Sequence, residues 1–151
     1  APAPQRLQTK FDTGFRAHNT NVFPQRPDRA YVGYIDGGAF VLDISNMSDI
    51  KVVSHWNHSP PFNGFIHTLL PIPTSFKSDT LIIGTFFNGG VRVFDTSNPY
   101  QVQEVAYFVP GAPKLSPAGA IQINDVFVDE NRIVYAQDRF GGGLYILEMT
   151  I

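Results

Sequence analysis

The chain has 151 residues, enough for one domain with a buried core, and its 43% apolar and 16% charged residues are typical of a globular protein of low charge. Its net charge of -2 and the lack of a Lys or Arg cluster argue against binding to nucleic acid or to an anionic membrane. The absence of cysteine excludes disulfide bonds, thiolate metal sites and cysteine nucleophiles, and no apolar run reaches the roughly 18 residues of a membrane-spanning helix.

The predicted elements are all strands, because 13 Phe, six Tyr, 13 Gly and 12 Pro favour strands and turns, and no segment has a convincing helical period. The first predicted strand is residues 4–12, which contain "QRLQTKFD". Further along, "GGAFVLDISNMSDIKVV" (Gly37 to Val53) gives a Gly-Gly pair, an apolar strand, an acid, a Ser-Asn turn and the start of another strand, which continues as "SHWN".

The middle of the chain predicts four strands in succession: "HTLLPIP", "TLIIGTFF", "GVRVFDT" and "VQEVAYFV", which lie within residues 67–109. Each is rich in β-branched or aromatic residues and is bounded by Gly, Pro, Asn, Asp or Ser. After them, "AIQINDVFV" predicts the first strand of another unit and "GLYILEMTI" its third.

These elements form an internal repeat. "GGAFVLDISNMSDIKVV" matches "GGVRVFDTSNPYQVQEV" (Gly89 to Val105), so that Gly38 pairs with Gly90 at a spacing of 52 (90 − 38). "GGLYILEM" (Gly142 to Met149) is a third copy. A repeated unit of about 50 residues with four antiparallel strands is typical of a β-propeller blade.

The predicted fold is therefore all-β, a β-propeller with about three four-stranded antiparallel blades in this chain. The blade-equivalents are about 15–62, 63–116 and 117–151, the last one closed by the N-terminal strand 4–12. Rings usually need four to eight blades. Two interpretations remain open: further copies of the chain complete the ring, or the chain is part of a longer propeller.

The segments "LIIGTFFNGGVRVFDTSNPYQVQEVAYFVP" and "INDVFVDENRIVYAQDRFGGGLYILE" resemble the LVIVD-repeat proteins of bacteria, from about Phe15 onward. In that family a strand that ends in Asp-Ile-Ser, or in a near variant, recurs in each blade of a predicted β-propeller. The resemblance implies a propeller that is exported, secreted or periplasmic. It implies little about activity, because most of the family is uncharacterised.

His18 and His67 are the candidate ligand residues, since both stand at the first strand of a blade, 49 residues apart (67 − 18). In a propeller this strand lines the central channel, where imidazoles from neighbouring blades can share a divalent metal. In the third blade, Gln122, Asn124 or Asp125 takes the corresponding place. The alternative is that each histidine bonds the backbone of a neighbouring blade.

Asp43, Asp95 and Glu148 end the third strand of each unit, and we predict structural roles for them in the turns that follow. Asp36 and Asp138 precede glycines and suit hairpin turns. The sequence thus favours an exported binding scaffold for a small ligand or a partner protein. The alternative is an enzyme that holds a metal through His18 and His67, with its reaction and catalytic residues unspecified.

Overall fold

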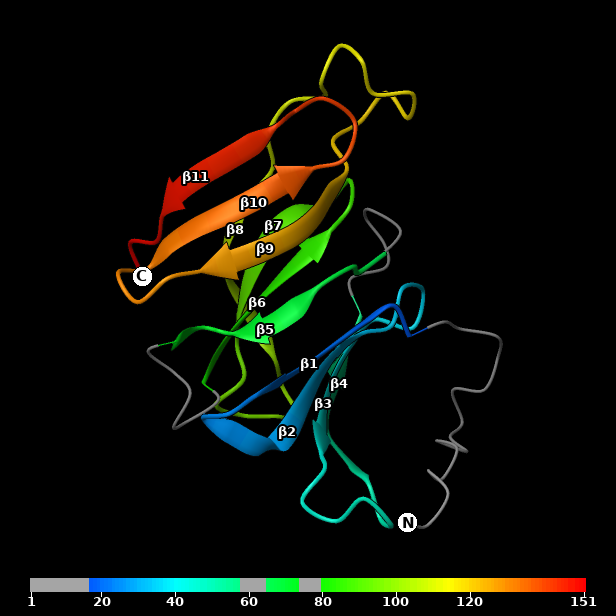
Figure 1. Cartoon of the computed structure of the whole chain (residues 1–151), viewed down its shortest axis with the longest axis vertical. Coiled ribbons are helices and arrows are strands. Elements are labelled where there is room, and N and C mark those ends of the chain that lie inside the picture. Colours follow the sequence, from blue (N-terminus) through cyan, green and yellow to red (C-terminus); the bar gives the residue numbers. More distant parts are fainter. Residues whose placement is uncertain (1–16, 58–64, 74–79) are drawn as a thin grey trace.

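The computed structural model describes residues 17–57, 65–73 and 80–151, so the N-terminal strand expected at 4–12 lies outside the described residues. Within these ranges the chain is all-β and forms three antiparallel sheets in chain order (Figure 1). Among the described residues, no helix has the length and apolar character that crossing a bilayer requires.

Each of the first two sheets is a four-stranded meander, with every strand hydrogen-bonded to the next along the chain. The first sheet contains β1 (Asn19–Phe23), β2 (Arg26–Gly33), β3 (Ala39–Asp43) and β4 (Lys51–Trp56). The second contains β5 (Leu69–Pro71), β6 (Leu81–Phe86), β7 (Gly90–Asp95) and β8 (Gln103–Phe108).

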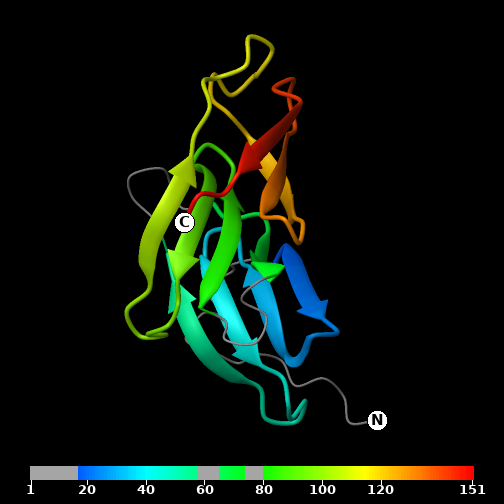
Figure 2. The ribbon, with the colours of Figure 1, turned by 90° about the vertical axis from the view of Figure 1, so that its left-hand side faces the viewer.

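The third sheet has three strands, β9 (Ile123–Val128), β10 (Ile133–Asp138) and β11 (Leu144–Glu148), in the order β11-β10-β9. β11 corresponds to β3 and β7 and is an edge strand, because the third sheet has, among the described residues, no fourth strand like the β4 and β8 that complete the other two sheets. The three sheets follow one another in space, from the blue and cyan first sheet through the green second sheet to the orange and red third sheet (Figure 2).

The core lies between successive sheets. Tyr31 and Val41 of the first sheet pack with Ile82, Phe86 and Phe94 of the second in one apolar cluster. A second cluster joins the other side of the second sheet to the third sheet and includes Leu70, Ile83, Val93, Val126, Val134 and Ala136. Strand alternation explains this arrangement, because neighbouring residues of β6 point to opposite faces of the sheet and so reach different neighbours.

Two isolated bridges connect successive sheets in the same way. Ile66 donates its backbone N–H to the carbonyl of Ile35, and Ile123 donates its own to the carbonyl of Phe87. The two acceptors are 52 residues apart (87 − 35), and both have positive φ angles, 36° and 27°. The sequence repeat is thus also a repeat of packing, because the same backbone distortion, a positive φ angle at the acceptor residue, occurs at both junctions between sheets.

The Gly-Gly pairs of the repeat are needed where the third strand begins. Gly38 and Gly90 have φ angles of 89° and 72°, in the left-handed region that favours glycine. A Cβ atom at either position would lie 2.3 Å from a carbonyl oxygen, that of Trp56 or of Phe108. Fold geometry therefore accounts for these repeated glycines.

Asp43 and Asp95 occupy equivalent turns. The Asp43 carboxylate accepts the Ser45 N–H at 2.9 Å, and the Asp95 carboxylate accepts the Ser97 N–H at 2.8 Å. Hydrogen bonds from these serines hold the pKa of each carboxyl below its usual value. Glu148 ends β11, opposite Ile133, with an exposed side chain.

Candidate functional site

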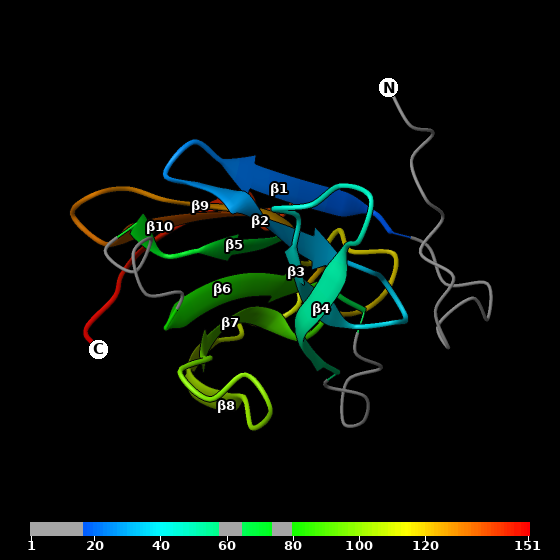
Figure 3. The same ribbon diagram turned by 90° about the horizontal axis from the view of Figure 1, so that it is seen from below.

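A groove of about 480 Å³ runs beside the first strands of the three sheets, β1, β5 and β9, which lie next to one another in Figure 1 and, seen from below, in Figure 3. Its wall is apolar where Leu70, Pro71 and Val126 contribute and polar elsewhere. Three acids of the third sheet, Asp125, Asp129 and Glu130, line it, and no Lys or Arg is among the described residues that do. The remaining lining residues are Asn19, Asn21, Phe23, Gln25, Thr68, Pro73, Phe127 and Val128.

The bridges between sheets fix which inner-strand residues correspond. Because Ile66 and Ile123 make the same bridge, His67 in the second sheet corresponds to Asn124 in the third. Among the three residues that the sequence proposed for this place, Asn124 is therefore the one in register. Gln122 is used locally: its Nε2 donates to the carbonyl of Ile121 at 2.8 Å.

His18 and His67 lie side by side, with ring centroids 4.1 Å apart and ring planes at 47°. His67 is 6% exposed, whereas His18 is exposed just before β1. Backbone bonds hold both residues against a second strand, because His18 donates its N–H to the carbonyl of Gly33 and His67 donates its own to that of Thr85. The structure thus brings the two predicted histidines together. Both backbone bonds are made to the next strand of the same sheet, β2 or β6, and not to a neighbouring blade as the alternative interpretation expects.

Thr68 joins the three first strands through its hydroxyl group. Asn19 Nδ2 donates to Thr68 Oγ1 at 3.1 Å, and Thr68 Oγ1 donates to Asp125 Oδ1 at 2.9 Å. Each of these residues follows one of the inner-strand positions His18, His67 and Asn124 by one place. An equivalent position in all three sheets therefore forms one continuous hydrogen-bonded chain.

This series of hydrogen bonds also fixes the tautomer of His67. Its Nδ1 lies 2.9 Å from Thr68 Oγ1 and 3.5 Å from Asp125 Oδ1. A hydroxyl has one hydrogen, and the Thr68 hydroxyl donates it to the carboxylate, so Nδ1 must be the donor in its contact with Thr68. A neutral His67 consequently carries its proton on Nδ1 and presents the lone pair of Nε2.

The surroundings of His67 favour that neutral form. Burial lowers the pKa of His67 below its usual value, and the positive charges of His18 and Arg139 lower it further. The Asp125 carboxylate opposes the shift without reversing it. His67 also meets the Phe87 ring edge-on, with centroids 5.5 Å apart. It is therefore a neutral donor held between an anion and an aromatic ring.

Asn124, which corresponds to His67, contributes a buried polar atom. Its Oδ1 is buried and has no hydrogen-bond partner among the residues that the structure describes. Its backbone carbonyl accepts the Thr85 hydroxyl, and Thr85 Oγ1 in turn accepts the Thr68 N–H at 3.2 Å. The backbone here is well satisfied, which leaves one acceptor on the Asn124 side chain for an additional donor.

For the metal hypothesis, two imidazoles and one carboxylate in this region are the candidate ligands. In the described ranges, no group of three or more His, Cys, Asp or Glu side chains is arranged to hold a metal ion. The Nδ1 of His67 is occupied by its contacts with Thr68 and Asp125, so any coordination by this ring would fall to Nε2.

Sequence reasoning missed Thr68 and Asn19, and it underestimated Asp138. Asp138 is 4% exposed and accepts the backbone N–H groups of Gln122, Phe140 and Gly142 at 2.7 to 2.9 Å. Burial raises its pKa, but these N–H groups outweigh that effect and the pKa is lowered. A signal for Thr68 and Asn19 was present, since each directly follows a histidine singled out by the repeat.

In comparisons with models of protein families, with curated proteins and with solved structures, none matches this chain.

Proposed function

We propose that the chain is a segment of an exported, LVIVD-type β-propeller, secreted or periplasmic, that acts as a binding scaffold. In this proposal each sheet is a blade, the first strands β1, β5 and β9 face the channel, and the groove beside them holds the ligand. Three antiparallel meanders that follow one another with the same junctions support the arrangement.

The ligand that best suits this groove is a small organic cation with a hydrocarbon part. The observation that carries this proposal is the chain Asn19–Thr68–Asp125, which fixes one carboxylate on the wall while leaving its side chain 59% exposed. Asp129 and Glu130 add negative charge, and Leu70 and Pro71 provide apolar contact. Such a mixture of apolar wall and few oriented polar groups is the usual composition of small-molecule sites.

Butylguanidinium and butylammonium are suitable probes, with butyrate as the control of opposite charge. We expect both cations to shift the amide NMR signals of Asp125 and Thr68 on titration and butyrate to leave them in place. Asp125→Asn keeps an acceptor for Thr68 but removes the charge, so affinity should fall roughly fivefold, the effect of about 1 kcal/mol for a half-exposed ion pair. Asp49→Asn removes an equal charge on an exposed turn and should change nothing. Equal shifts with butyrate, or none with either cation, would refute the proposal.

The second candidate function is a metal-dependent enzyme, and the contact between the His18 and His67 rings is the observation that favours it. A divalent metal would act there as a Lewis acid or redox centre. Elemental analysis of the purified protein tests it directly. The enzyme hypothesis expects stoichiometric metal that is lost in the double variant His18→Ala/His67→Ala, and it fails if the wild-type protein, dialysed against Zn²⁺ or Mn²⁺, retains neither.

A further inference from the structure

Each terminal sheet has an apolar face on the side away from the second sheet. On the first sheet the centre of this face, Ala30, Val32, Phe40 and Leu42, is 4 to 6% exposed, and Val22 and Val52 at its rim are 51% and 42% exposed. A cavity of about 280 Å³ lies on the outer face of the first sheet, and its lining is almost entirely apolar. The lining residues are Ala17, Thr20, Val22, Ala30, Val32, Tyr34, Phe40, Leu42, Ile44, Met47, Ile50 and Val52; we call this the leading face. On the third sheet, Phe127, Leu144 and Ile146 are 62%, 60% and 64% exposed, and with Tyr135 they form what we call the trailing face.

The repeat shows what covers such faces elsewhere in the molecule. Residues of the second sheet at the positions of the leading face are buried against the first sheet: Leu69, Ile82 and Phe94 correspond to Thr20, Ala30 and Leu42. Ile82 follows Ala30, and Phe94 follows Leu42, by 52 residues (82 − 30; 94 − 42). The leading face is therefore built like a surface that receives the preceding sheet of the repeat.

The trailing face has the complementary character. Tyr135 and Ile146 correspond to Ile83 and Val93 of the second sheet, 52 and 53 residues earlier (135 − 83; 146 − 93). Those two residues are 0% and 4% exposed, because they are buried against the third sheet. A trailing face thus fits a leading face, and one more copy of the chain supplies both at once.

The edge of the third sheet points to the same partner. A groove of about 430 Å³ lies between β8 and the edge strand β11 and is lined by Ala106, Phe108, Leu147 and Met149 among others. In the first two sheets this position beside the third strand holds β4 or β8, each of which leads directly to the first strand of the next sheet. Within the described residues the third sheet has no strand at this position, so its edge is open to a strand from another chain.

We propose that two copies of this chain close one six-sheet ring, with each leading face packed on the partner's trailing face. The inference rests on the propeller arrangement proposed above, and six sheets lie within the usual range for closed rings. The contact is heterologous, yet it closes by two-fold rotation because each chain supplies half of the ring.

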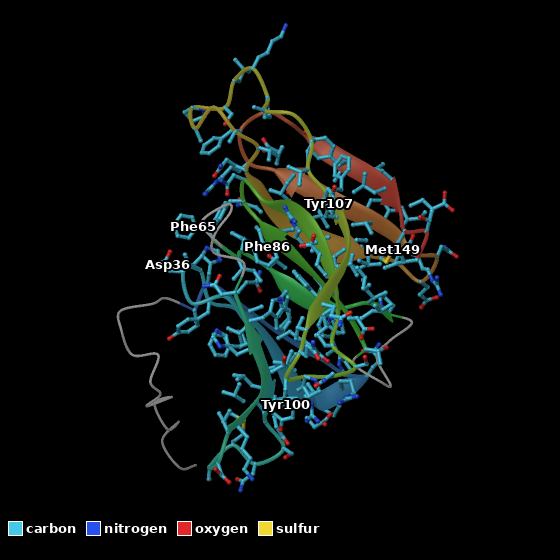
Figure 4. All side chains as sticks on the ribbon, turned by 180° about the vertical axis from the view of Figure 1, so that it is seen from behind. Asp36, Phe65, Phe86, Tyr100, Tyr107 and Met149 are labelled. Atoms are coloured by element: carbon cyan, nitrogen blue, oxygen red, sulfur yellow. The ribbon has the colours of Figure 1, made fainter. Side chains whose placement is uncertain are left out.

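Sedimentation equilibrium of the whole chain tests the ring, with an expected mass of twice the 16.8 kDa of one chain. Val22→Arg on the leading face (51% exposed) and Ile146→Arg on the trailing face should each raise the dissociation constant at least about 100-fold, because each places a charge in both symmetric contacts. The matched control is Tyr100→Arg, in the β7–β8 turn with 94% exposure (Figure 4), which should leave the mass unchanged.

Mixing the two variants distinguishes this contact from any other. A heterodimer of Val22→Arg and Ile146→Arg chains has one contact free of substitutions, so the mixture should contain dimers that neither variant forms alone. A monomeric wild type would refute the ring. So would a dimer that Val22→Arg leaves intact, or a variant mixture that stays monomeric. Titration of the same samples with butylguanidinium keeps the two proposals separate: a monomer that binds the probe refutes the ring alone.

Discussion

Replacing the Thr68 hydroxyl by a methyl group in Thr68→Val should weaken the protein and release the imidazole of His67 from its fixed tautomer. The hydroxyl of wild-type Thr68 contacts Asn19, His67 and Asp125. The Asp125 side chain is 59% exposed and regains water, so the loss of its bond contributes little. The His67 side chain is 8% exposed, and a buried donor that loses its partner costs about 1 to 3 kcal/mol. We expect the free energy of unfolding to fall by about 2 kcal/mol.

Urea unfolding at fixed protein concentration measures this change. Thr150→Val is the control, because Thr150 is exposed near the C-terminus and its replacement should change the free energy of unfolding by no more than about 0.5 kcal/mol. Nitrogen chemical shifts of the imidazole report the tautomer independently of stability. In the wild type, Nδ1 of His67 should give the signal of a protonated ring nitrogen and Nε2 that of an unprotonated one. If Nε2 carries the proton in the wild type, or if Thr68→Val unfolds at the wild-type urea concentration, the hydrogen-bonded chain does not work as described.

Two further predictions concern pH and backbone geometry. Burial holds the folded-state pKa of His67 below its usual 6.5, so the unfolded chain binds the proton first as pH falls. The free energy of unfolding should therefore drop as pH decreases below 6.5, until the folded-state pKa is passed. Urea unfolding as a function of pH should show no such drop from this residue in His67→Gln, and a profile that the substitution leaves unchanged would contradict the assignment. Gly90→Ala should destabilise the protein by about 2 kcal/mol or more, because the left-handed backbone alone costs about 1 to 3 kcal/mol for a residue with a side chain and the new Cβ meets the Phe108 carbonyl. Gly111→Ala is the control, since a Cβ there meets nothing within 4 Å. Similar thermal unfolding of the two variants would contradict this prediction.

The sheets were predictable because strand patterning and turn residues repeat in the sequence. The strand predicted from "TLIIGTFF" became β6, and "GVRVFDT" became β7, each trimmed by one or two residues at its ends. Gly38 and Gly90 mark the same backbone requirement, and the Ser-Asn turns follow the same acids. Local chemistry decides all of these features, so a single sequence contains enough information for them.

The site was less predictable, because connections of different lengths precede the first strands. His18 and His67 are 49 residues apart, whereas His67 and Asn124 are 57 apart (124 − 67), although the hairpins repeat every 52 or 53 residues. Only the bridge made by Ile123 shows that Asn124, and not Gln122 or Asp125, takes the place of His67. The partners of Thr68 lie on two other sheets, and no local pattern states how closely those sheets approach.

The inner strands differ from the rest of the repeat in a way that bears on function. At the left-handed glycines Gly38 and Gly90, and at the turn acids Asp43 and Asp95, the first two units carry the same residue types. At the two inner-strand positions the three sheets instead carry His, His and Asn, followed by Asn, Thr and Asp. The backbone makes equivalent bridges at these junctions, so the fold does not require these differences. Asn19, Thr68 and Asp125 line the groove. In the binding function proposed above, these differences are what adapts the repeat to a ligand, and the Asp125 carboxylate is what favours a cation.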